Sequence, residues 1–153
     1  MADEFDLTRS FALRADTAAE LAACNELTSR YGLTLSGEQI RELSEARVLA
    51  LRNTGRVEFG GGILKKLICA FCDSPYLFQE TYEETLLELQ DIFYEYKNES
   101  MDRISDDDLI RFMRKSFDGD CQGSLDYLRE TTLEALARGL RSGFREGLTD
   151  ERF

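Results

Sequence analysis

A single proline, Pro75, occurs in this chain of 153 residues. Proline breaks helices in their interior and is common in turns, so its near absence favours long, uninterrupted helices over a turn-rich β fold. Hydrophobic residues make up 42% of the sequence and charged residues 32%, which is typical of a folded domain with a buried core. No proline- or serine-rich linker and no internal repeat divides the chain. We therefore predict one all-α domain over residues 1–153.

Helix start and stop signals indicate about six helices, packed as a compact bundle. The sequences TAAE at 17–20 and SGEQ at 36–39 are capping boxes, and Gly32 and Gly55 are the expected ends of the helices that follow them. Further helices are expected to start at residues 60–62, at Ser74–Pro75, at Ser105 and at Ser124.

The helix predicted from Ser74–Pro75 to about Lys97 has apolar residues on two sides. Its main stripe consists of Tyr82, Leu86, Leu89, Phe93 and Tyr96. Leu87 and Tyr94 lie roughly 100° or more away from this stripe. Such a helix is either central in the core, which we predict here, or in contact with a partner through Leu87 and Tyr94.

Two short stretches alternate apolar and polar residues, which is the periodicity of a strand rather than a helix. They are residues 7–13 and residues 56–59. We predict that they pair as a small two-stranded ribbon beside the bundle.

The sequence contains no histidine. This removes the usual general base near neutral pH, the commonest metal ligand and every Ser-His or Cys-His nucleophile arrangement. Carboxylate or lysine chemistry remains open, but no catalytic constellation stands out. We therefore favour a protein that is not an enzyme, and the alternative is an enzyme that acts on an anionic small molecule at residues 60–66.

The net charge of −11 argues against binding to nucleic acid or to an anionic membrane surface. No run approaches the roughly 18 apolar residues that a membrane span requires. The acidic start MADEFD does not resemble a signal peptide, and the four cysteines fit reduced thiols better than a disulfide framework. We expect a cytoplasmic protein.

The sequence DGDCQGSLDYLR at 118–129 matches much of the calcium loop of an EF-hand. The candidate calcium ligands are Asp118, Asp120, Gln122, Ser124 and Asp126, with Gly123 at the turn. Arg129 stands where a bidentate glutamate normally completes the coordination shell, and its positive charge is wrong for a hard cation. Our first interpretation is therefore a helix–loop–helix corner, and calcium binding is the alternative.

Cys69 and Cys72 form a single CxxC motif. Zinc needs four ligands, and the other two cysteines, Cys24 and Cys121, are isolated in the sequence. The motif falls in the last turn of a predicted helix, where the helix dipole opposes a thiolate. We interpret these residues as structural thiols, with a zinc or redox site as the alternative.

Gly60, Gly61 and Gly62 precede a predicted helix that carries Lys65 in its first turns. Free N–H groups at a helix start beside a cation form a candidate anion site. The spacing is not that of a P-loop, and the other interpretation is a flexible turn before the helix.

The last predicted helix carries a basic stripe of Arg138, Arg141 and Arg145. Residues 79–108 contain 11 acidic and 2 basic side chains, a net charge of −9. The stripe and this acidic segment can meet within one molecule or between two. The stripe is therefore a second candidate contact for a protein partner or for self-association.

Four stretches of the sequence share a wider similarity: RVEFGGGI at 56–63, CAFCDSPY at 69–76, KNES at 97–100 and FDGDCQGSL at 117–125. Through them most of the chain resembles a bacterial family known only as a domain of unknown function. The resemblance implies no activity, cofactor or site residue. From the residues themselves we predict a non-enzymatic protein-interaction or accessory module.

Overall fold

The computed structural model describes residues 17–142, which form helices joined by short connections. No strand occurs in this part of the chain, and the predicted all-α fold is confirmed. The predicted ribbon is corrected for residues 56–59, which form no strand. Glu58 holds this segment against its neighbours through its side chain rather than through a backbone ladder. The other half of the ribbon, residues 7–13, lies outside the described residues.

The first helix covers residues 17–28 and ends in a 3₁₀ turn, Ser29–Tyr31. It is followed by α2 (Gly37–Thr54), α3 (Gly62–Phe71), the 3₁₀ turn Gln79–Thr81, α4 (Tyr82–Glu99) and α5 (Asp106–Asp118). The last helical stretch consists of α6 (Leu125–Tyr127), a π-helical turn (Leu128–Thr132) and α7 (Leu133–Arg141).

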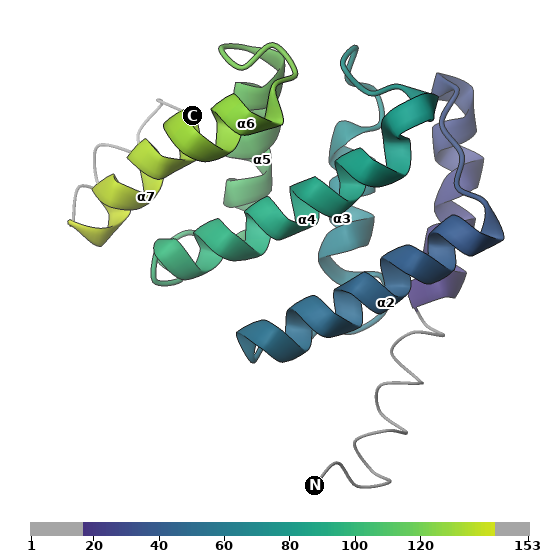
Figure 1. Ribbon diagram of the computed structural model, residues 1–153, viewed down its shortest axis with the longest axis horizontal. Helices are drawn as coiled ribbons and strands as arrows, with labels where there is room; N and C mark the ends of the chain where they lie inside the picture. Colours follow the sequence, from purple (N-terminus) through teal and green to yellow (C-terminus); the bar gives the residue numbers. More distant parts are fainter. Residues whose placement is uncertain (1–16, 143–153) are drawn as a thin grey trace, which may run out of the picture.

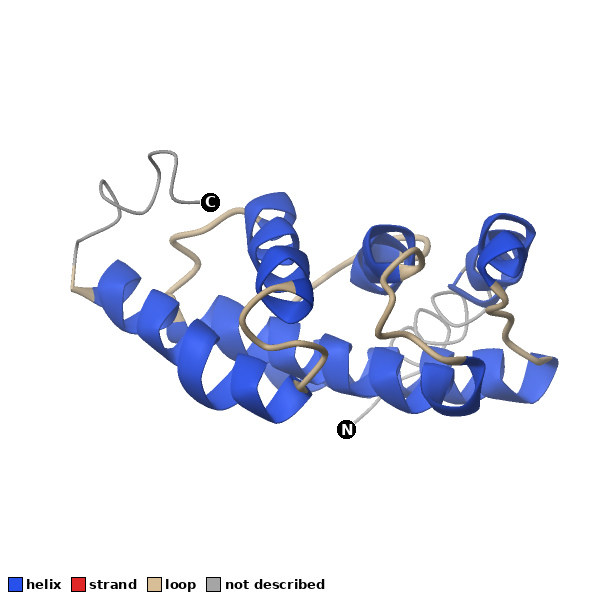
Figure 2. Ribbon diagram, turned by 90° about the horizontal axis from the view of Figure 1, so that it is seen from above, coloured by secondary structure: helices blue, strands red, loops and turns tan. Residues whose placement is uncertain are grey.

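The helices form two layers that cross each other. In Figure 1, α2, α4 and α7 run side by side in front, while the first helix, α3 and α5 lie behind them. The view turned by 90° shows the same two layers (Figure 2). Consecutive helices alternate between the layers, and α4 contacts α2, α3, α5 and α7. It is the central helix of the fold.

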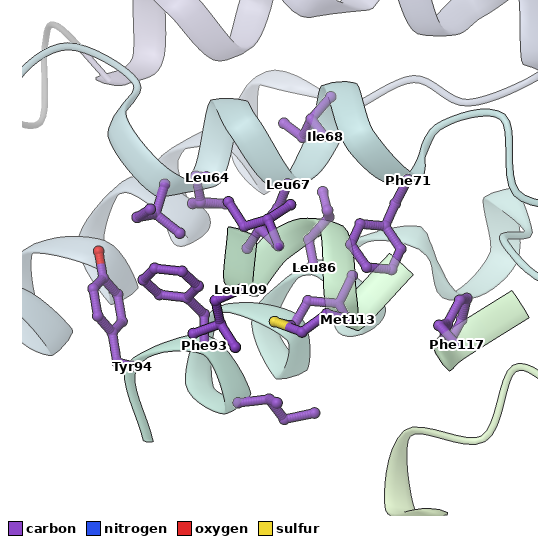
Figure 3. Close-up of a cluster of buried hydrophobic side chains, with 14 of the residues drawn as sticks. Leu64, Leu67, Ile68, Phe71, Leu86, Phe93, Tyr94, Leu109, Met113 and Phe117 are labelled. Atoms are coloured by element: carbon purple, nitrogen blue, oxygen red, sulfur yellow. The ribbon is translucent and has the colours of Figure 1, made fainter. Parts of the chain in front are cut away.

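The position of α4 explains its two apolar sides. Its main stripe, Tyr82, Leu86, Leu89, Phe93 and Tyr96, is buried in the core. Tyr94 is buried as well, and Leu87 is half-buried against the same core. Figure 3 shows side chains of α3, α4 and α5 pointing toward one another, including Phe93, Met113 and Phe117. The central position predicted for this helix is confirmed.

Local sequence signals set most helix ends. Ser36 and Gln39 form the predicted capping box at the start of α2, and Gly55 ends that helix in a left-handed conformation with φ of 68°. Ser105 caps α5 by accepting a hydrogen bond from the Asp108 N–H at 3.1 Å. Each of these contacts joins residues close in sequence, so the spacing alone predicts them.

The start of α4 differs from the prediction. The helix begins at Tyr82, seven residues after Pro75, because Ser74–Pro75 opens a turn instead. The Ser74 hydroxyl accepts a hydrogen bond from the Tyr76 N–H at 3.2 Å and donates one to Asp118 Oδ1 at 2.7 Å. The contact with α5 therefore replaces the expected helix cap.

Candidate functional site

A buried arginine organises the start of α3. The Arg47 side chain on α2 has no exposed surface, and its Nε donates a hydrogen bond to Glu58 Oε1 at 3.2 Å. Its Nη1 donates to the Gly60 carbonyl at 2.6 Å and to the Thr17 hydroxyl. The Tyr94 hydroxyl donates to the other Glu58 oxygen at 2.7 Å. This polar centre fixes the 56–62 connection between α2 and α3.

Arg47 was not among the residues predicted from the sequence, although a signal for it was present. Ile40, Leu43 and Leu51 share its face of α2 at helical spacing, so an arginine among them is a charge on an apolar stripe. A charge in this position is buried only when it is paired and hydrogen-bonded, which is how the structure places it.

At the candidate anion site, the N–H groups of the helix start and Lys65 contact carboxylates of the chain itself. Glu20 of the first helix accepts a hydrogen bond from the Gly61 N–H and lies 3.2 Å from Lys65 Nζ. The contact with Lys65 has the larger effect on the pKa of Glu20, and together the two contacts hold that pKa below its usual value. Glu58 accepts a second N–H at this helix start, that of Ile63 at 3.2 Å. The site therefore joins parts of the protein rather than presenting an open anion pocket.

A groove of about 420 Å³ lies between α3 and α5. It is lined by Ala70, Asp107, Ile110, Arg111, Arg114 and Lys115, and we call it the cationic groove. Three of these residues are basic and one is acidic, so the lining has a formal charge of +2 (3 − 1) on a chain of net charge −11.

Ion pairs between α3 and α5 hold the cationic groove in shape. Lys66 Nζ lies 2.8 Å from Asp107 Oδ1. Arg114 Nη1 lies 2.6 Å from Asp73 Oδ1 and donates to the Ala70 carbonyl at 2.5 Å, while its Nε donates to Asp118 at 2.7 Å. The hydrogen bond from Arg114 lowers the pKa of Asp73. Arg114 is thus fixed by contacts within the protein.

Two cations of the groove are available to a ligand. Arg111 is exposed, and its ion-pair partner is Asp108 of the same helix, at 2.5 Å. Exposed pairs of this kind contribute little stability, so a ligand can compete for the guanidinium. Lys115 is exposed and has no ion-pair partner within residues 17–142. A sequence signal for the groove was present, because Arg111, Arg114 and Lys115 are spaced so that they lie on one face of α5.

The candidate calcium loop closes the corner between α5 and α6. Both carboxylate oxygens of Asp118 are engaged, one by the Ser74 hydroxyl and the other by Arg114. The Ser124 hydroxyl caps α6 by accepting from the Tyr127 N–H at 3.1 Å. Asp120, Gln122 and Asp126 are exposed. Arg129, at the last position of the motif, lies 3.2 Å from Glu95. The loop thus has the contacts of a helix–loop–helix corner, and calcium binding stays untested.

The cysteines are free thiols of unequal exposure. Cys24, Cys72 and Cys121 are buried, whereas Cys69 is exposed near the end of α3. Burial raises the pKa of the Cys24 thiol to about 11. No group of three or more Cys, Asp or Glu side chains between residues 17 and 142 is arranged to hold a metal ion.

The other candidate interaction residues differ in accessibility. Tyr94 is corrected as a partner contact, because it is buried and its hydroxyl binds Glu58. Arg138 is exposed and lies 3.6 Å from Glu134 of its own helix. Arg141 Nη1 lies 3.0 Å from Glu99 Oε1, so this part of the basic stripe meets the acidic segment within one molecule. Arg145 lies outside the described residues.

The fold and its surface define an acidic, all-helical domain with a preformed cationic groove. No helix between residues 17 and 142 is long and apolar enough to cross a membrane. The chain belongs to a family described as a family of unknown function (DUF6323), whose model matches residues 20–146. Searches of curated proteins and of solved structures find no significant match.

Proposed function

We propose that this protein is a non-enzymatic interaction module that binds an acidic segment of a partner protein in the cationic groove. The observation that carries the proposal is the pair of exposed cations in the groove: Lys115, which has no ion-pair partner within residues 17–142, and Arg111, which is paired with Asp108 of its own helix. A local cationic site on an acidic protein attracts acidic ligands while the remaining surface repels them.

The lining also supports a peptide rather than a free inorganic anion. Ile110 and Ala70 supply apolar surface between the charged side chains. Arg111 and Lys115 are separated by one helical turn, about 6 Å along α5. A peptide with carboxylates on both sides of an apolar residue would engage both cations and cover this surface. A single small anion would reach only part of it.

Charge reversal in the groove tests the proposal. The probe is a fluorescein-labelled nonapeptide in which one leucine lies between aspartate and glutamate residues, and the readout is fluorescence anisotropy. We expect Arg111→Glu and Lys115→Glu each to weaken binding about tenfold, or about 1.4 kcal/mol. Binding should also weaken as salt is raised, because these charges are exposed.

Arg41→Glu is the matched control. Arg41 is an exposed arginine on α2 with glutamates one turn away on either side, at 4.0 and 3.6 Å. Its reversal changes the net charge equally but leaves the groove intact, so binding should stay within twofold of the wild type. An equal loss of peptide binding in Arg41→Glu would show that binding depends on the total charge of the protein and not on the groove. Failure of the wild-type protein to prefer the acidic peptide over a neutral analogue would overturn the proposal.

A further inference from the structure

Three of the four cysteines lie where the first helix packs on α3. Cys24 belongs to the first helix, and Cys69 and Cys72 come from the end of α3. Cys121 is elsewhere, with its Sγ 3.5 Å from the Thr132 hydroxyl. The packing of these two helices decides which thiols can react with each other.

The contacts one turn earlier place Cys24 opposite Cys69. Glu20 precedes Cys24 by four residues and Lys65 precedes Cys69 by four, and Glu20 Oε1 lies 3.2 Å from Lys65 Nζ. Side chains four residues apart lie on one helix face. The two helices also approach closely here, since a Cβ built on Gly61 would lie 3.3 Å from Glu20 Cβ. Consistent with this arrangement, the nearby Cys69 thiol is one of the groups that raise the pKa of Cys24, after burial.

In the CxxC motif, the Cys72 thiol is buried and donates to the backbone carbonyl of Cys69, with its Sγ 3.8 Å from that oxygen. The candidate pair of Cys24 and Cys69 instead joins residues 45 positions apart in the chain.

We propose that Cys24 and Cys69 form an intramolecular disulfide when the protein meets a peroxide. Cys69 is exposed and is attacked first: its thiolate bonds to one peroxide oxygen, the O–O bond breaks and Cys69 becomes a sulfenic acid. The Cys24 sulfur then displaces the hydroxyl group from the Cys69 sulfur, and water leaves. In total, two thiols and hydrogen peroxide give one disulfide and two water molecules.

The surroundings suit this order of steps. Cys24 is 7% exposed, so a peroxide in solution reaches Cys69 before it reaches Cys24. The Lys65 ammonium partly offsets the effect of burial, which raises the pKa of the Cys24 thiol to about 11. The disulfide would tie the first helix to α3 and raise the unfolding temperature by several degrees.

Oxidation of the full chain with hydrogen peroxide tests the inference. We expect the number of reactive thiols to fall from four to two per chain. The product should be monomeric and two hydrogen atoms lighter than the untreated protein. Dithiothreitol should restore the four thiols by reducing the disulfide. Because the tryptic peptide 67–97 contains both Cys69 and Cys72, the cross-link is mapped in the Cys72→Ser variant. There it should join peptide 15–30 to peptide 67–97.

Variants separate this pair from the alternatives. Cys69→Ser, at an exposed position, should abolish the intramolecular cross-link without loss of folding, whereas Cys121→Ser should form it at the wild-type rate. A link between Cys69 and Cys72, a disulfide between two molecules, or sulfinic acid at Cys69 without a cross-link would each overturn the inference. So would an unfolding temperature that does not change on oxidation.

Discussion

At the scale of single residues, Arg47 has the most demanding environment in the protein. Its guanidinium is fully buried and surrounded by Glu58, Thr17 and the Gly60 carbonyl. Gly62 lies directly against it with φ of 52°, and a Cβ at this position would overlap both Arg47 and Glu58. The glycine is therefore required by positive φ and by space, and not for flexibility.

Replacing Arg47 by methionine should cost about 3 kcal/mol in the free energy of unfolding. The loss comes from Glu58, whose carboxylate stays largely enclosed without its counter-charge. Urea unfolding of Arg47→Met measures it, and a second change, Glu58→Gln, should recover part of the loss by removing the unpaired charge. Arg41→Met on the exposed face of the same helix should cost less than about 0.5 kcal/mol. Equal costs in the two arginine variants would contradict this role of Arg47.

The residue scale also shows what the sequence can reveal. The stripe of Ile40, Leu43 and Leu51 is visible from spacing alone, and so is the arginine within it. Which carboxylate pairs with that arginine is not visible, because Glu58 belongs to a connection whose path depends on how α3 packs. The prediction of a helix start at the three glycines is correct, with Gly62 as the first residue of α3, but the carboxylates that contact this start, Glu20 and Glu58, come from other segments.

At the scale of elements, local signals predict helix ends well when both partners belong to one turn. Ser36, Gly55 and Ser105 act as predicted for this reason. Ser74 has the same local signal, yet its hydroxyl binds Asp118, which lies 44 positions further along the chain. A tertiary contact of this kind leaves no mark in the local sequence, so the start of α4 was misplaced. For the cationic groove, the spacing of the basic residues on α5 indicates one face, but the groove itself arises only when α3 and α5 pack together.

A pair of carboxylates joins α2 to α4 and should make stability depend on pH. Burial raises the pKa of Glu83 to about 7, and its hydrogen bond to Glu42 acts in the same direction. Between the ordinary glutamate pKa of about 4.5 and this value, the folded state binds more protons than the unfolded state. The contribution of Glu83 to the free energy of unfolding therefore falls as pH rises through this window and is constant above it.

The variant Glu83→Gln keeps the side chain neutral and should remove this dependence. We expect its unfolding temperature to match the wild type near pH 4.5 and to exceed it by about 2–4 °C at pH 8, which corresponds to about 1 kcal/mol. Thermal unfolding across this range measures the difference in unfolding temperature between the two proteins. The contributions of other titrating groups are the same in both and cancel in this difference. Glu84→Gln, at the exposed neighbouring position, serves as the control and should show no such trend. A constant difference between wild type and Glu83→Gln at all pH values would contradict the prediction.

At the scale of the whole molecule, the 118–129 loop joins segments that are distant in sequence. Asp118 connects the end of α5 to Ser74 and, through Arg114, to the end of α3. The ring of Tyr76 packs against Gly123, where a Cβ would lie 2.7 Å from it. Arg129 connects the loop's C-terminal side to Glu95 of α4. These contacts give the loop a role in the packing of α3, α4 and α5.

Thermal unfolding with millimolar calcium, against chelator and with magnesium as control, separates this role from calcium binding. A ligand that binds only the folded state at 100 times its dissociation constant adds about 2.7 kcal/mol, a shift of several degrees. We expect no calcium-specific shift, because calcium would have to displace Ser74 and Arg114 from Asp118 and approach Arg129. Asp118→Ala should lower the unfolding temperature equally in calcium and in chelator, since it loses the contacts with Ser74 and Arg114 in both. A calcium-dependent rise that disappears in Asp118→Ala would instead make the loop a binding site, with Asp118, Asp120 and Asp126 as its ligands.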